Sequence, residues 1–277
     1  MTELKNAKNI KTDILIVGSG AAGLYCALKL PKEKQIVIIT KEDAESSDSF
    51  LAQGGMCVLK SEEDYDRYFE DTMRAGHYKN RKESVDIMIR SSQDIVKELI
   101  RYGVEFEQEN GKLMYTREGG HSTHRIVFHE DITGKEITSK LLAAVKKCEN
   151  VKLIEYTTMI DLLTDGTTCM GAVTVDKEDR KQVIEAGDTV LACGGLGGLY
   201  EHSTNFRHLT GDALAIALSH GIKLENIDYI QIHPTTLYSK KPGRRFLISE
   251  SVRGEGAVLL DKNGNRFVNE LLPRDLL

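Results

Sequence analysis

Residues 12–28 read Thr-Asp-Ile-Leu-Ile-Val-Gly-Ser-Gly-Ala-Ala-Gly-Leu-Tyr-Cys-Ala-Leu. The apolar run 14–17 is typical of a buried parallel strand, and a glycine-rich turn and a helix follow it. Gly18 and Gly20 allow the backbone to turn sharply and to approach a phosphate closely, and Gly23 allows the helix to pack tightly on the strand. The first amides of that helix would favour an anion. This strand, turn and helix predict a site for the pyrophosphate of a dinucleotide.

The second expected strand, residues 35–40, bears on which dinucleotide is bound. It ends about twenty residues after the first glycine, where an NAD site usually has an Asp or Glu for the ribose. Here the strand ends in Thr40 and Lys41, with Glu42 and Asp43 just beyond. The displaced acid weakens the NAD interpretation and leaves a flavin dinucleotide open. A nucleotide fold that binds nothing is the remaining alternative.

The composition is that of a soluble globular protein. The chain has 277 residues, enough for one large domain or two ordinary ones, with 40% apolar residues and a formal net charge of -5. Lys and Arg are scattered, which disfavours nucleic-acid binding. No apolar run approaches the length of a transmembrane helix, and residues 1–11 lack the apolar core of a signal peptide, so we expect a cytoplasmic protein.

The cysteines and histidines give no metal-site pattern. The five cysteines are an odd number without C-x-x-C spacing, so neither a disulfide framework nor a zinc site is expected, and they are most simply small core residues. Four histidines lack metal-ligand spacing and are expected at the surface or at helix ends: His77, His202, His208 and His220.

Local patterns predict the remaining elements. Helices are expected at residues 61–75, 82–102, 135–147 and 211–219, and a glycine-ended loop at 46–55. Strands are expected at residues 151–158, 170–176 and 181–185, the last two joined by a turn. A second buried strand begins at Asp188 and leads into a glycine-rich turn at 194–198. We therefore expect an α/β fold with a Rossmann-like central parallel sheet, a small antiparallel layer, and two glycine turns that hold one extended ligand. A merely tight corner at 194–198 is the alternative.

Further motifs resemble those of one flavoprotein family, that of succinate dehydrogenase, fumarate reductase and L-aspartate oxidase. They are Ser49-Phe-Leu-Ala-Gln-Gly-Gly, Arg117-Glu-Gly-Gly-His-Ser-Thr-His-Arg, Leu191-Ala-Cys-Gly-Gly, Gln231-Ile-His-Pro-Thr, Ser249-Glu-Ser-Val-Arg-Gly-Glu-Gly, Arg266-Phe and Pro273-Arg-Asp. The resemblance implies an FAD-binding domain over residues 1–232 and an incomplete capping domain over residues 233–277. It implies contacts to FAD from Gly18, Ser19, Gly20, Ala21, Ala22, Gly23, Thr40, Lys41, Ser49, Ala52, Gln53, Gly54, Gly55, Ala192, Gly194, Gly195 and Asp212.

Two positions distinguish the branches of this family. The respiratory enzymes attach FAD covalently to a histidine five residues before the Gln of the A-Q-G-G motif, and Asp48 stands at that position here. Asp48 cannot form that bond, so the resemblance implies non-covalent FAD. The segment from Arg117 to Arg125 is most similar to L-aspartate oxidase, in which a glutamate lies near the substrate amine. Glu118 matches that glutamate.

The resemblance also implies substrate and catalytic residues for a four-carbon dicarboxylate. Arg274 is suited to bidentate pairing with a carboxylate, and His233 could donate to a carboxylate oxygen. Thr235 and Ser249 could add hydroxyl donors. Members of the family that reduce fumarate use an arginine for proton exchange with the substrate carbon, supplied through a Glu and an Arg three residues apart. Arg274, Glu250 and Arg253 match those positions, although a guanidinium is a poor acid or base because its pKa exceeds about 12.

The function implied by the resemblance is FAD-dependent oxidation of L-aspartate to iminoaspartate. Glu118 would pair the α-ammonium, and oxygen or fumarate would reoxidise the flavin. This is the first step of quinolinate and NAD biosynthesis, with quinolinate synthase as the pathway partner. A fumarate reductase or succinate dehydrogenase type flavoprotein is one alternative. Because the family pattern continues beyond residue 277, a fragment or a shortened relative is expected, and a flavin-binding module without turnover is the other alternative.

Overall fold

The computed structural model describes residues 8–118, 120–254, 256–270 and 272, which form two compact units. Unit 1 contains the described residues up to Leu51, Thr138–Tyr229 and Ser239–Arg245. Unit 2 contains Ala52–Ile137, Ile230–Tyr238 and the described residues from Phe246 onward. Both units are therefore assembled from separate segments of the chain. The two-domain division expected from the sequence, with its boundary after residue 232, stays a prediction.

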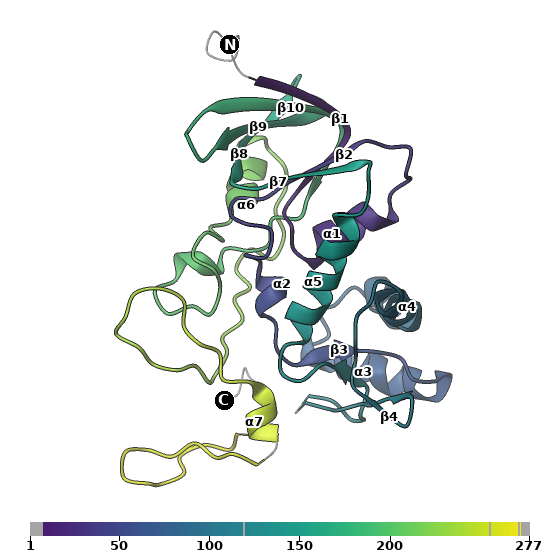
Figure 1. Cartoon of the computed structure of the whole chain (residues 1–277). Helices are drawn as coiled ribbons and strands as arrows, with labels where there is room; N and C mark the ends of the chain where they lie inside the picture. Colours follow the sequence, from purple (N-terminus) through teal and green to yellow (C-terminus); the bar gives the residue numbers. More distant parts are fainter. Residues whose placement is uncertain (1–7, 119, 255, 271, 273–277) are drawn as a thin grey trace. The chain divides into compact units, whose positions relative to one another are not determined.

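The described strands of unit 1 form a six-stranded sheet in the order β7-β2-β1-β10-β9-β8 (Figure 1). Their bounds are Lys8–Val17 (β1), Ile36–Ile39 (β2), Val151–Ile154 (β7), Thr157–Thr164 (β8), Cys169–Asp176 (β9) and Lys181–Leu191 (β10). Strands β7, β2, β1 and β10 are parallel, whereas β9 and β8 are antiparallel. The expected α/β fold with a central parallel sheet is confirmed.

The centre of this sheet is buried on both faces. Leu15 and Ile16 in β1 and Ile38 and Ile39 in β2 all have 0% exposure, although neighbouring residues point to opposite faces. Helices α1 (Ala21–Lys29) and α6 (Asp212–Ser219) belong to the same unit and contribute Leu24 and Ile216 to the buried set. The continuous apolar runs of the sequence therefore correspond to inner parallel strands.

The antiparallel strands differ in detail from the sequence prediction. Residues 151–158 do not form one strand, because β7 ends at Ile154 and β8 begins at Thr157, with Tyr156 at a φ of 51°. The predicted strands at 181–185 and from 188 onward are one strand, β10. Since β10 pairs with β1 on one side and β9 on the other, the antiparallel layer is continuous with the main sheet.

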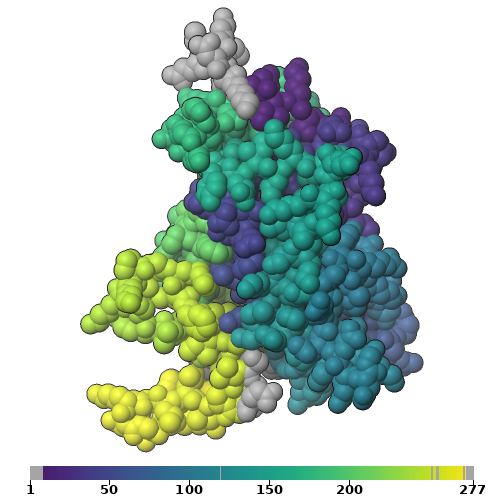
Figure 2. Space-filling model, viewed as in Figure 1, coloured from purple at the N-terminus to yellow at the C-terminus, as the bar shows by residue number. Residues whose placement is uncertain are grey.

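Unit 2 is built around two helices that follow a short 3-10 helix, η1 (Glu62–Asp64). Helices α3 (Tyr65–Ala75) and α4 (Lys82–Arg101) enclose an apolar cluster that includes Tyr68, Met73 and Ile89, and part of their outer surface is visible in blue in Figure 2. Gly103 ends α4 at a φ of 95°, and the Val104 amide donates to the Leu99 carbonyl at 3.0 Å. This is the glycine C-cap predicted from the sequence.

The other described elements are short, except for α5. Strands β3 (Gly55–Cys57) and β6 (Ile126–Phe128) pair antiparallel, as do β4 (Gln108–Glu109) and β5 (Lys112–Leu113). The predicted loop at 46–55 contains α2 (Asp48–Leu51). The remaining helices are α5 (Thr133–Val145), η2 (Gly197–Leu199) and α7 (Glu250–Gly254). None of the described helices is both long enough and apolar enough to cross a membrane.

Burial in the last part of the chain is polar. After Ala217, the buried side chains among the described residues are Thr235, Arg245, Ser249, Arg253 and Glu270. Large apolar side chains in the same stretch are exposed, as the 75% exposure of Ile232 and the 66% exposure of Phe267 illustrate. Hydrogen bonds and ion pairs rather than an apolar core therefore organise the described residues of 218–272, several of which are expected site residues.

Candidate functional site

The two predicted glycine turns lie side by side at one edge of the sheet of unit 1. Strands β1 and β10 are parallel neighbours in which Val17 pairs with Leu191, so both strands end at the same level. The Ala192 amide donates to the Val17 carbonyl at 2.8 Å, and the Gly18 amide donates to the Ile39 carbonyl at 2.9 Å. Ligands of open α/β sheets bind outside this carboxyl edge.

The first turn requires glycine for steric reasons. Gly18 has a φ of 118°, and a Cβ on it would lie 2.2 Å from the carbonyl oxygen of Ala192. A Cβ on Gly23 would lie 2.1 Å from the carbonyl oxygen of Gly18. Only glycine therefore allows this close approach of β1, α1 and the second turn. This supports the prediction that the glycine-rich turn at residues 18–23 binds a dinucleotide.

The N-terminus of α1 faces this edge without a side-chain cap. Gly20 is the N-cap residue and makes no capping hydrogen bond, and the first turn of α1 contains no acidic residue. The Ala21 amide donates to the Ser49 hydroxyl at 3.1 Å. The partial positive charge of the helix end is thus not neutralised by a carboxylate, as a phosphate site requires.

A cavity of about 440 Å³ lies at the same edge, within unit 1. This volume is typical of a small-molecule pocket. Its lining includes ten of the expected FAD contacts: Gly18, Ser19, Gly20, Ala22, Thr40, Lys41, Ser49, Ala192, Gly194 and Asp212. Ala21, Gly23 and Gly195 do not line it. The sequence did not predict Ser46, Ser47, Thr157, Met159 or the neighbours of Asp212, which are His208–Gly211, Ala213 and Leu214.

Lys41 connects two walls of this cavity. Its Nζ donates to Asp212 Oδ2 at 2.7 Å, to the Thr210 hydroxyl at 2.9 Å and to the His208 carbonyl at 3.0 Å. Burial would raise the pKa of Asp212, but the hydrogen bonds from Lys41 and Thr210 outweigh it and lower that pKa. Lys41 therefore ties the end of β2 to the start of α6, a role that its position in the sequence did not indicate.

Asp48 lies in the cavity lining and forms hydrogen bonds within unit 1. Its carboxylate accepts from the Asn205 side chain and, at 3.1 Å, from the Phe206 amide. Burial raises the pKa of Asp48, and these hydrogen bonds oppose that shift. The position that carries the flavin-linked histidine in other members of the expected family thus holds the 205–206 segment here.

These features fit the dinucleotide part of FAD. The start of α1 has no N-cap side-chain bond and no acidic residue in its first turn, and the cavity walls supply hydroxyls and apolar surface. Burial also raises the pKa of Cys193, another lining residue, to about 11, so its thiol stays protonated and unreactive at neutral pH. Among the described residues, no group of three or more His, Cys, Asp or Glu side chains could hold a metal ion.

In unit 2, the A-Q-G-G motif lies against Glu118. Gly54 has a φ of 42°, and a Cβ on it would lie 2.7 Å from Glu118 Oε1. The Gly54 carbonyl accepts a hydrogen bond from the hydroxyl of Thr133, and the Ala52 carbonyl accepts one from the Gly134 amide at 2.9 Å. The expected flavin motif and the expected substrate glutamate, which are far apart in the sequence, are therefore adjacent.

Gln53 connects the same motif to the segment that holds other expected substrate residues. Its Nε2 donates to the Leu247 carbonyl at 3.3 Å, while its buried Oε1 has no partner among the described residues. Leu247 forms an antiparallel bridge with Thr236. A buried amide oxygen without a donor is costly, so the side chain of Gln53 is suited to accept a hydrogen bond from a bound group.

His233, Thr235 and Ser249 lie in the stretches next to this bridge. His233 Nδ1 lies 3.0 Å from the Thr235 carbonyl oxygen, which fixes the ring orientation. The Thr235 hydroxyl donates to the Ile248 carbonyl at 3.1 Å, and Ser249 is 5% exposed. Because the hydroxyl of Thr235 already donates its hydrogen to a backbone carbonyl, it is better suited to holding Thr235 against Ile248 than to donating to a substrate.

Glu250 and Arg253 are on one short helix, α7. Arg253 Nη2 lies 3.8 Å from Glu250 Oε2, and Arg253 Nη1 donates to the Glu270 carbonyl at 3.0 Å. Arg253 is 4% exposed, yet its Nε and Nη2 have no hydrogen-bond partner within the described part of the chain. A buried guanidinium with two nitrogens that make no hydrogen bond, one of them 3.8 Å from the Glu250 carboxylate, is suited to an anion or carboxylate partner. Arg274 lies outside the described residues.

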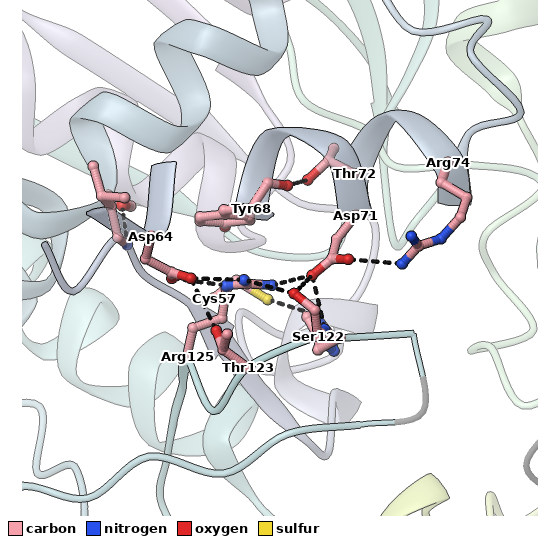
Figure 3. A network of polar contacts seen from close by, with 12 residues as sticks. Cys57, Asp64, Tyr68, Asp71, Thr72, Arg74, Ser122, Thr123 and Arg125 are labelled. Atoms are coloured by element: carbon pink, nitrogen blue, oxygen red, sulfur yellow. Dashed lines mark hydrogen bonds and ion pairs between the residues drawn. The ribbon is translucent and has the colours of Figure 1, made fainter. Parts of the chain in front are cut away.

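A buried ionic network close to Glu118 was not predicted from the sequence (Figure 3). Arg125 has 0% exposure and donates to Asp64 through Nε at 3.0 Å and Nη2 at 2.9 Å, and to Asp71 through Nη1 at 2.6 Å. Its guanidinium also stacks over the Tyr68 ring, 4.9 Å from the centroid. Neither aspartate belongs to a quoted motif, so no sequence signal linked them to Arg125.

Comparison with protein families and known proteins extends these observations. The family model described as FAD binding domain matches residues 13–277. An L-aspartate oxidase of Clostridium perfringens is 46% identical over 266 residues, which cover 96% of this chain and 60% of that protein. An L-aspartate oxidase of Clostridium acetobutylicum is 45% identical, over 97% of this chain and 62% of that protein. The chain thus spans about 60% of the length of these relatives.

Solved structures of flavoproteins are similar to the chain as well. The E. coli quinol fumarate reductase FrdA superposes with a TM-score of 0.88 at 28% identity, covering 97% of this chain and 49% of that chain. A flavocytochrome c3 fumarate reductase superposes with a TM-score of 0.82 at 27% identity, covering 99% of this chain and 51% of that chain. With the glycine cradle and cavity of unit 1, these matches lead to one conclusion: the chain belongs to the FAD binding domain family, and the flavoprotein family predicted from its motifs is confirmed.

Proposed function

We propose that this chain serves the FAD-dependent oxidation of L-aspartate to iminoaspartate. The observation that carries the proposal is the position of Glu118, whose carboxylate lies against Gly54 of the A-Q-G-G motif. Relatives named L-aspartate oxidase at 45–46% identity support it further. FAD, when bound without a covalent link, supplies the hydride acceptor.

The chain's own residues bind and orient the substrate in this proposal. The carboxylate of Glu118 pairs the α-ammonium of L-aspartate, and a carboxylate paired with an ammonium forms a strong, charge-assisted hydrogen bond. Arg274 binds a substrate carboxylate, and His233 and Ser249 add donors. Glu250 and Arg253 would carry a proton to or from the substrate carbon by way of Arg274. Oxygen or fumarate is the proposed final acceptor, and quinolinate synthase the proposed pathway partner, of a cytoplasmic enzyme.

The test compares Glu118→Gln with the wild-type chain. Because the amide cannot pair a cation as the carboxylate does, the KM for L-aspartate should rise about 10- to 100-fold, as expected for a lost hydrogen bond to a charged group. Fumarate has no ammonium, so fumarate reduction should change less than about twofold. Glu109→Gln, which neutralises an exposed carboxylate in β4 of the same unit, is the matched control.

Bound flavin and aspartate-dependent peroxide are measured on the same samples. Equal loss of both activities in Glu118→Gln would contradict the proposed role of Glu118. Fumarate reductase function is the second candidate, favoured by the TM-score of 0.88 to a fumarate reductase, and it predicts fumarate reduction without aspartate oxidation. Bound flavin without either activity would indicate a flavin-binding module.

A further inference from the structure

The segment that carries Glu118 is a loop closed at its base. Thr116 and Ile126 exchange backbone hydrogen bonds at 2.9 and 3.0 Å, which brings the two ends of the segment together. Within it, the His121 amide donates to the Glu118 carbonyl at 3.0 Å. The position of Glu118 therefore depends on how residues 121–125 are held. We define the Glu118 loop as the described residues of 116–126.

Unit 2 holds this loop from one side through Asp64 and Asp71 (Figure 3). Asp71 Oδ2 accepts from the Ser122 amide at 2.8 Å, from the Ser122 hydroxyl at 2.7 Å and from Arg125 at 2.6 Å. Asp64 Oδ1 accepts from the Thr123 hydroxyl at 3.0 Å and from Arg125 at 2.9 Å. Three residues of the loop are thus fixed by two carboxylates, one at the residue before α3 and one about two turns into that helix.

The next tie is His121, whose Nε2 lies 3.1 Å from Cys57 Sγ in β3. Burial raises the pKa of Cys57, so the thiol remains neutral and the contact is a hydrogen bond rather than an ion pair. Since the His121 amide also closes the turn that begins at Glu118, this contact fixes the loop at the residue next to Ser122, which Asp71 holds. The second half of the loop is therefore held at residues 121, 122, 123 and 125.

The chemistry of these contacts indicates positioning rather than stability alone. Burying Arg125 at 0% exposure carries a large desolvation cost, and well-packed apolar side chains can stabilise a core as well as a buried ion pair does. An ion pair with fixed hydrogen bonds does what apolar packing does not, because it imposes one geometry on the groups that it joins. Here the joined groups are α3 and the Glu118 loop.

We propose that Arg125, with Asp64 and Asp71, forms a positioning network that sets the location of the Glu118 carboxylate and thereby the affinity for the substrate ammonium. This inference rests on the proposed function and deepens it. In this proposal the network residues do not touch the substrate. They act through Ser122, Thr123 and the closed loop, so their loss should change the binding of the amine more than the rate of the chemical step.

The test removes one tie and leaves the ion pairs intact. Ser122→Ala deletes the hydroxyl that donates to Asp71 at 2.7 Å and accepts from Arg125 Nη2 at 3.4 Å. It keeps the hydrogen bond of the Ser122 amide to Asp71 and the ion pairs of Arg125 with Asp64 and Asp71. The KM for L-aspartate should rise about tenfold with less than about a twofold change in kcat, because a hydrogen bond to a charged group is lost. Fumarate reduction should change less than about twofold, and Ser122→Thr, which keeps a hydroxyl, should restore the KM.

The matched control is Thr72→Val on the same helix, α3. The Thr72 hydroxyl donates to the Tyr68 carbonyl at 2.8 Å within the helix and does not tie the loop. Amide hydrogen exchange gives a readout besides activity: Ser122→Ala should speed exchange in the described residues of 116–126 more than in the rest of unit 2, and Thr72→Val should not.

Three results would overturn the inference. They are equal kinetic losses with aspartate and fumarate, unchanged exchange in the loop of Ser122→Ala, and an equal effect of Thr72→Val. A wild-type chain that binds flavin but does not oxidise aspartate would instead refute the proposed function. The exchange data would then still decide whether the network holds the loop.

Discussion

Replacing Asp71 by Asn should destabilise the chain in a way that depends on pH. The pKa of Asp71 is about 2 instead of 3.8, because hydrogen bonds from Ser122 and Arg125 outweigh the effect of burial, which alone would raise it. Since each pKa unit corresponds to 1.36 kcal/mol, the ionised carboxylate contributes about 2 kcal/mol to the free energy of unfolding at pH 7. The amide has one acceptor oxygen for several donors, so the total loss should reach about 2 to 4 kcal/mol.

The sign of the pH dependence follows from the direction of this shift. The unfolded chain binds a proton at Asp71 near pH 3.8 and the folded chain only near pH 2, so acid favours the unfolded chain. The stability difference between wild type and Asp71→Asn should be constant down to about pH 5, should fall by roughly half near pH 3, and should lose the charge-dependent part below about pH 2.

Urea unfolding followed by far-ultraviolet circular dichroism at pH 7, 5 and 3 measures this difference. The control is Asp94→Asn, which removes a carboxylate that is 82% exposed and lies 3.0 Å from Lys97. This control should change stability by less than about 0.5 kcal/mol, as is usual for exposed ion pairs. A loss below about 0.5 kcal/mol in Asp71→Asn, or a loss that stays the same from pH 7 to pH 3, would refute the reasoning.

Three further substitutions test the two units. Gly18→Ala places a Cβ at a φ of 118° and 2.2 Å from a carbonyl oxygen, so the free energy of unfolding measured in urea should fall by about 3 kcal/mol or more. The variant should also lose bound flavin, measured as the flavin-to-protein absorbance ratio. Gly54→Ala should lower the free energy of unfolding by only about 1 to 2 kcal/mol, the penalty for a left-handed backbone. It should raise the KM for L-aspartate as Glu118→Gln does, because the new Cβ would lie 2.7 Å from Glu118 Oε1. Asp48 has a raised pKa, so the folded chain takes up its proton first; the stability of wild type relative to Asp48→Asn, measured by urea unfolding, should therefore increase as the pH falls from 7 towards 4.

Local patterns in the sequence were sufficient for the elements that they specify. The apolar run before Gly18 predicted an inner strand, and the helical spacing ended by Gly103 predicted α4 and its C-cap, because each depends on neighbours in the sequence. The break between β7 and β8 was missed, since Tyr156 adopts a positive φ without a Gly or Pro to mark it.

The sequence predicted only those site residues that belong to the quoted motifs. Gly54 and Glu118 were each named as site residues, but their adjacency follows from the fold and not from spacing. Arg125 was visible as the last residue of a motif, whereas its partners Asp64 and Asp71 are separated from it by more than 50 residues and have no periodicity or motif that marks them. Pairing over such separations is decided by tertiary structure, which a single sequence does not record.

The central position of β1 has a consequence for synthesis of the chain. One neighbour, β2, follows it closely, but the other, β10, contains residues 181–191 and pairs with it in parallel. At typical ribosomal speeds β10 emerges on the order of 10 to 30 s after β1, so one side of a strand that ends in the apolar run 14–17 lacks its partner during that time. Chaperone binding to the nascent chain should therefore concentrate on residues 8–17 until β10 has been made, and the glycine turn that receives the pyrophosphate is complete only after that delay.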